Sequence, residues 1–129
     1  MLISFDQLLH LAAQQTEPQR ILFVFATREL RPGHQEKKEP DFTIIPQMFN
    51  DKTLDQLSTF DALAQEAKDA GLIWDLLFAS GLEGANGQVP SLKLTDERLD
   101  LMVQAILQGV VEPFAIFDPS GNPVNLSRS

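Results

Sequence analysis

The sequence predicts an α+β (mixed α/β) fold, with a single mixed sheet of about four to five strands and three helices packed on it. Three observations lead to this class. Three segments carry apolar residues at helical spacing, several short apolar runs are typical of strands, and the two kinds of segment alternate along the chain. The predicted order is α-β-β-α-β-α-β-β, and a length of 129 residues suits a single domain spanning residues 1–129.

The N-terminal part predicts a helix followed by a buried strand. Ser4 is placed to cap the helix, whose apolar residues recur on one face as far as Ala12, and Glu17-Pro18 should end it. The apolar run RILFVFA at residues 20–26 is too short for a separate helix. We therefore expect a strand that is buried on both faces.

A polar segment and a second strand come next. Residues 27–41 contain two prolines and mixed charge, which predicts a loop that is mobile at its tip. Residues 42–49 predict a strand antiparallel to the first, because no helix joins the two. Pro46 cannot donate a hydrogen bond to a sheet, so we expect an edge position or a bulge there.

Two overlapping capping signals follow the second strand. Thr53 with Gln56 and Ser58 with Asp61 have the spacing of capping boxes. They predict a short helical turn and then a longer helix over residues 59–70, which the next glycine should end.

The C-terminal half predicts two more strands separated by a helix. Residues 72–80 are expected to form a strand in which Asp75 needs an exposed position or a partner. Thr95 is expected to cap a helix whose apolar stripe spans residues 99–107. A strand, a turn at residues 119–122 and a short returning strand should end the chain. The helical connections should be right-handed crossovers where they join parallel strands.

Composition limits the possible functions. The chain has 10 Lys and Arg against 18 Asp and Glu, a formal charge of −8 that disfavours nucleic acid and anionic membranes as partners. It has no cysteine, so thiolate nucleophiles, disulfides and Cys-bound metals are excluded. The N-terminus does not have the pattern of a signal peptide, and no apolar run is long enough to span a bilayer. We expect a cytoplasmic location.

The stretch GLEGANGQVP at residues 81–90 comes closest to a cofactor motif. A phosphate cradle needs a helix that opens directly off the glycines, so that its N-terminal amides face the anion. Here Pro90 and several further residues intervene, and Glu83 adds a negative charge. We therefore expect a surface loop with a tight turn at Asn86-Gly87, and no cofactor.

Two further motifs, a pair of histidines at metal-ligand spacing and a serine nucleophile motif, are missing from the sequence. The only histidines, His10 and His34, lack the spacing of metal ligands, so no metal site is expected. There is no Gly-x-Ser-x-Gly sequence for a nucleophile. The sequence favours a protein without enzymatic activity but does not decide the point.

Two sets of candidate site residues follow from position alone. In sheets with crossover helices, ligands gather beyond the carboxyl ends of the strands. The candidate ligand-binding residues there are Arg28, Ser80, Asn86 and Asn122. Met48 and Phe49 on the predicted edge strand are candidate interface residues, although both also suit the core.

Two classes of function stay open. The first is a non-enzymatic protein-interaction or regulatory module that binds a protein partner or forms a homodimer. The alternative is a domain that binds a small anionic ligand, or an enzyme, with its site in the loops at the strand ends.

Five segments carry a family resemblance over nearly the whole chain: ILFVF, PQMFNDKTLDQLSTFDALAQEA, WDLLFAS, GANGQVPS and FAIFDPSGNPVNL. Through them the chain resembles a small proteobacterial family whose members often carry the label "ribonucleotide reductase subunit alpha". Ribonucleotide reduction by the large subunit uses a cysteine radical and a redox-active cysteine pair, so a chain without cysteine does not support that label.

A fainter resemblance, to the SseB-like domain, is carried by IIPQMFNDKTLDQLSTF and ILQGVVEPFAIFDPSGNPVNL. It implies the same succession of strands, polar loop and helices as the pattern of apolar residues does.

Overall fold

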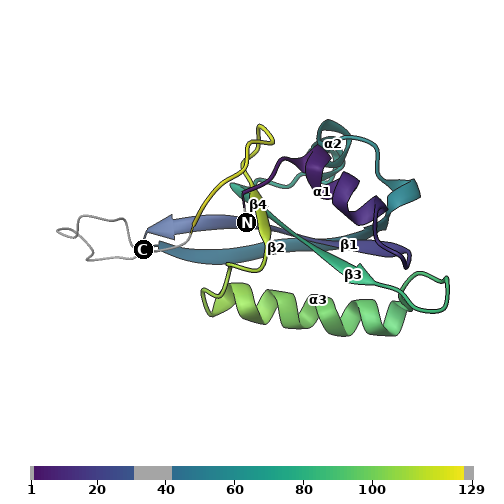
Figure 1. Cartoon of the computed structure of the whole chain (residues 1–129). Helices are drawn as coiled ribbons and strands as arrows, with labels where there is room; N and C mark the ends of the chain where they lie inside the picture. The colour runs from purple at the N-terminus through teal and green to yellow at the C-terminus, as the bar shows by residue number, and fades with distance from the viewer. Residues whose placement is uncertain (1, 31–41, 127–129) are drawn as a thin grey trace.

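The computed structural model describes residues 2–30 and 42–126. Within these residues four strands form one sheet in the order β2-β1-β3-β4: β1 (Gln19–Leu30), β2 (Phe42–Thr53), β3 (Leu76–Glu83) and β4 (Ala115–Phe117). Helices α1 (Phe5–Ala13) and α2 (Phe60–Asp69) lie on one face of the sheet, and α3 (Leu92–Leu107) lies on the other (Figure 1).

The topology confirms the α+β class and corrects the arrangement of the strands. All three strand pairs in the described residues are antiparallel, whereas a mixed sheet was expected. β2 and β3 both run antiparallel to β1, which lies between them. The connection through α2 therefore joins parallel strands that are not neighbours, and α3 joins two antiparallel neighbours.

β1 forms the centre of the core, as its apolar run predicts. Its side chains alternate between the two faces of the sheet. Ile21, Phe23 and Phe25 pack against α1 and α2. Leu22, Val24 and Ala26 pack against α3 and the segment before β4. All six are buried, so the strand is covered on both faces, and the prediction is confirmed.

β2 is an edge strand with a bulge, which confirms both expectations for Pro46. Phe25 pairs with Met48 and Ala26 pairs with Pro46, so Gln47 is an extra residue in β2. The two strands are longer than predicted. Residues 27–30 continue β1, which corrects the predicted start of the polar loop, and the rest of that loop lies outside the described residues.

The first two helices begin at short-range caps. Ser4 Oγ accepts from the Gln7 amide at 3.0 Å, and Gln7 Oε1 accepts from the Ser4 amide at 2.9 Å, so the predicted cap is present. In α2 the cap is Thr59 rather than Ser58, since Thr59 Oγ1 accepts from the Ala62 amide at 3.1 Å.

α3 begins earlier than predicted. Its cap is Ser91, whose Oγ accepts from the Leu94 amide at 3.1 Å. Thr95, the predicted cap, instead lies within the first turns of α3, and its side chain is fully buried. Its hydroxyl donates to the Ser91 carbonyl at 2.7 Å. Because this hydrogen bond satisfies the hydroxyl, the polar side chain can be buried. Leu107, expected on the apolar stripe, is 53% exposed.

β3 begins at Leu76, later than predicted, and Asp75 lies where its pairing with β1 ends. The Asp75 amide donates to the Ala26 carbonyl at 2.8 Å. Its carboxylate accepts from the Arg28 amide at 2.8 Å, which is the partner that the sequence required. Trp74, just before it, packs edge-on against Phe25 at a ring-centroid distance of 5.1 Å.

The returning strand expected at the C-terminus is present only as an isolated bridge. The Val124 amide donates to the Ile116 carbonyl at 2.8 Å, and Phe117 pairs with Pro123. This segment therefore covers the outer edge of β4 without forming a fifth strand in the described part of the chain.

Comparing Leu63→Ala in α2 with Leu92→Ala in α3 should separate the contribution of core packing from that of helix propensity. Leu63 is 2% exposed between α2 and the sheet, so we expect a loss of about 2–5 kcal/mol in the free energy of unfolding, measured by urea denaturation. The control is Leu92→Ala in α3, where the side chain is 70% exposed and a change within about 0.5 kcal/mol is expected. Equal losses in both variants would contradict the core described above.

Candidate functional site

The antiparallel sheet separates the residues of the predicted strand-end site. The carboxyl ends of neighbouring antiparallel strands lie at opposite ends of the sheet. Arg28 follows Ala26, which pairs with Leu76, whereas Asn86 follows Glu83. The level of Leu76 is about 23 Å from that of Glu83 along the strand. Arg28 and Asn86 therefore lie at opposite ends of the sheet.

Asn122 and Ser80 occupy two further places. Asn122 lies in the turn after β4, where its amide donates to Asp118 Oδ1 at 3.0 Å. That turn is at the same end of the sheet as Arg28, because Phe117 pairs with Leu77. Ser80 lies within β3, opposite Leu22 and on the α3 side. The four residues do not form one site.

The glycine loop holds a carboxylate from the chain itself. Glu17 Oε2 accepts from the Asn86 amide at 3.1 Å and Oε1 accepts from the Gly87 amide at 2.8 Å. Ala85 and Gln88 exchange two backbone hydrogen bonds of 3.0 Å. Asn86 and Gly87 both have positive φ, at 55° and 75°, which is the tight turn expected from the sequence. The amides that a phosphate would need are thus occupied by Glu17.

Glu17→Ala should weaken this turn. Loss of both hydrogen bonds to a charged acceptor is expected to lower the free energy of unfolding by about 1–2 kcal/mol, and Glu17→Gln, which keeps one acceptor oxygen, by about half as much. Urea denaturation measures both. Glu97→Ala on the exposed side of α3 removes the same charge elsewhere and serves as the control. Identical stabilities for the two alanine variants would show that Glu17 does not hold the turn.

The two candidate interface residues have different surroundings. Met48 pairs with Phe25 and packs against the core on the side of α1 and α2. Phe49 pairs with Val24 and is 55% exposed on the side of α3. Only Phe49 is available to a partner.

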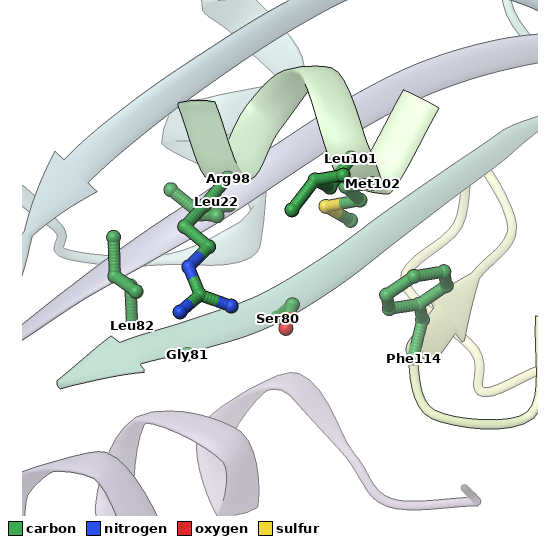
Figure 2. Close-up of a pocket in the computed structure, with 8 residues that line it drawn as sticks. All are labelled: Leu22, Ser80, Gly81, Leu82, Arg98, Leu101, Met102 and Phe114. Atoms are coloured by element: carbon green, nitrogen blue, oxygen red, sulfur yellow. The ribbon is translucent and has the colours of Figure 1, made fainter. Parts of the chain in front are cut away.

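A groove of about 220 Å³ lies between α3 and β3, and we call it the α3–β3 groove. It exists because α3 packs mainly over β2 and β1, and because β4 pairs only with residues 77–79 of β3. Figure 2 shows α3 on one side of β3, with Phe114 beside the strand. The residues that line the groove are Leu22, Ser80, Gly81, Leu82, Arg98, Leu101, Met102 and Phe114.

The last residues of β3 have an open side next to this groove. The Gly84 amide donates to the Pro18 carbonyl at 2.9 Å, so Gly84 is turned toward β1. Because backbone groups alternate along a strand, those of Gly81 and Glu83 point away from β1, to the side of β4. β4 begins only opposite Ala79, so it does not extend along these two residues. Both residues are exposed. They offer two N–H and two C=O groups to a further strand.

Arg98 is the cation of the groove. Its side chain extends from α3 over β3, toward Gly81 and Leu82 (Figure 2). Within the described residues no ion pair or hydrogen bond of its guanidinium is found. Its neighbours one turn away on the helix are apolar or uncharged: Leu94, Thr95, Leu101 and Met102. The guanidinium is therefore available to an acidic group.

The sequence-based candidates include Ser80 but miss Arg98. The available signal was its position on α3, since an arginine shares one helical face with Leu94 and Leu101. That signal cannot be recognised without knowing that β4 is short, because a longer β4 would cover this face of β3.

Comparisons with known proteins do not add to this description. The chain matches no protein-family model, no curated protein and no solved structure. In the described part of the chain, His, Asp and Glu side chains form no group of three that could hold a metal ion. None of the described helices has the length and apolar character needed to cross a bilayer.

Hydrogen exchange should reveal the open side of β3 directly. The amides of Ser80 and Leu82 point toward β1, whereas those of Gly81 and Glu83 have no strand to donate to among the residues that the structure describes. We expect the second pair to exchange at least about tenfold faster than the first, measured residue by residue by NMR. Equal protection of all four amides would mean that the edge is covered.

Proposed function

We propose that the protein is a non-catalytic binding module that takes up an extended segment of a partner protein along the open side of β3. The observation that carries this proposal is that β4 is short and begins only opposite Ala79 of β3. Within residues 2–30 and 42–126, this leaves the backbone groups of Gly81 and Glu83 without a pairing strand, directly beside the α3–β3 groove. An added strand would gain main-chain hydrogen bonds from β3 and side-chain contacts from the groove, as in other cases of strand addition.

The other edge of the sheet is less suited to this role. β2 carries Pro46, which has no N–H, and a bulge at Gln47. Proline and bulges are devices that protect edge strands from pairing with another chain. The pairing of β3 with β1 continues without a bulge from Gln19 to Ala26, opposite Glu83 to Leu76. Strand addition at β3 is therefore the better-supported choice.

A second candidate function is the binding of a small anionic ligand. It is supported by Ser80 and Arg98, which line the same groove and offer a hydroxyl and a guanidinium. Such a ligand would not need the backbone groups of Gly81 and Glu83, which distinguishes the two functions. The resemblance to the proteobacterial family, the cytoplasmic location and the exclusion of nucleic acid stay predictions.

The test uses the full chain and a peptide selected from a random displayed library. When this peptide is titrated into isotope-labelled protein, we expect the largest amide shifts at Gly81, Leu82 and Glu83, with slower exchange of the Gly81 and Glu83 amides. Glu83→Pro removes an outward N–H and should weaken binding by about tenfold. Glu83→Ala keeps that N–H and is the matched control.

Three results would oppose the proposal. The first is selection of no peptide, and the second is a peptide whose shifts lie away from β3. The third is equal binding by the proline and alanine variants, provided that thermal unfolding shows both to be folded. Inorganic phosphate that shifts Ser80 and Arg98, but not Glu83, would favour the small anionic ligand instead.

A further inference from the structure

We infer, on the basis of the proposed function, that the bound segment belongs to a different protein and carries an acidic side chain that pairs with Arg98. A large apolar side chain two residues away would enter the α3–β3 groove. The inference concerns the chemistry of the partner, whereas the proposed function concerns only the mode of binding.

The acidic side chain follows from the position of Arg98. A strand added beside Gly81 and Glu83 runs under the guanidinium, which extends from α3 over this end of β3 (Figure 2). A carboxylate there would accept hydrogen bonds from a group that has no such partner in the described residues. The protein as a whole carries a charge of −8, which repels an acidic segment at a distance. The attraction between the carboxylate and Arg98 therefore acts only at short range.

The apolar side chain follows from the rest of the groove. Beyond Arg98, in the direction of Ser80, the lining consists of Leu101, Met102 and Phe114 (Figure 2). Leu101 is 60% exposed, and a bound apolar side chain would cover part of it. Side chains on one face of a strand recur at every second residue, so the acidic and apolar residues should be two positions apart.

Charge also argues against a second copy of this chain as the partner. An antiparallel pair of β3 strands related by a two-fold axis keeps the two α3 helices on the same side of the joined sheet. It would bring a second Arg98, rather than a carboxylate, to the groove side. Glu83 cannot compensate, because its side chain lies on the face opposite to Leu82 and the groove. Two chains of charge −8 also repel each other.

The experiment compares short capped peptides of alternating Thr and Val in which two residues of one face are varied. One peptide has Glu and Leu at these two positions, a second has Lys in place of Glu, and a third has Ala in place of Leu. Affinities are measured by calorimetry with the full chain. We expect the Glu–Leu peptide to bind at least about tenfold more tightly than the Lys–Leu peptide.

Variants of the protein assign these preferences to single residues. Arg98→Glu should reverse the order of the Glu and Lys peptides. Lys93→Glu makes the same change in charge at an exposed position of the same helix, outside the lining of the groove, and should alter affinities by no more than about twofold. Leu101→Ala should weaken the Leu peptide by about threefold or more and leave the Ala peptide unchanged.

The outcomes distinguish this inference from the proposed function. Peptides that shift Gly81 and Glu83 without any preference for Glu, or without dependence on Arg98, would overturn the inference and leave the proposed function standing. If none of these peptides, and none selected from the library, shifts Gly81 and Glu83, the proposed function itself fails. A dimer in sedimentation that Glu83→Pro dissociates would identify a second copy as the occupant and would also overturn the inference.

Discussion

The burial of β1 on both faces is the constraint on which the rest of the structure depends. A strand with apolar residues at six consecutive positions leaves neither face to water, so each face needs a cover. α1 and α2 supply one cover, and α3 with the segment before β4 supplies the other (Figure 1). The neighbouring strands on its two sides satisfy its backbone groups.

The second cover is incomplete over the end of β3. α3 lies over β1 and β2, and β4 begins opposite Ala79, so it does not extend along the residues of β3 that follow. In the described part of the chain, β1 is therefore the one strand that pairs with the end of β3. The proposed binding surface lies here, where strand pairing and helix packing end at different points. The strand-end site expected from the sequence does not arise, because antiparallel strands send their carboxyl ends in opposite directions.

Structural features that depend on residues close together in the chain could be predicted from the sequence. Features that depend on the pairing of distant strands could not. The Ser4 cap and the distortion at Pro46 need only local chemistry, and both predictions are confirmed. The direction of β3 and the point where β4 ends depend on contacts between distant segments. The start of α3 was missed because the Thr95 hydroxyl bonds to the Ser91 carbonyl inside the helix, which the capping rule does not consider. Arg98 was not among the predicted site residues because the groove that it lines depends on the short length of β4.

The glycine loop has a structural role that suits the proposed binding edge. Gly84 comes so close to Gln88 that a Cβ would lie 1.9 Å from the Gln88 carbonyl oxygen. Glu17 holds the two turn amides that follow. Together these contacts hold the end of β3 in an extended conformation in the protein itself. An edge that is already ordered loses less conformational entropy on binding, so a few main-chain hydrogen bonds can contribute more of their free energy to affinity.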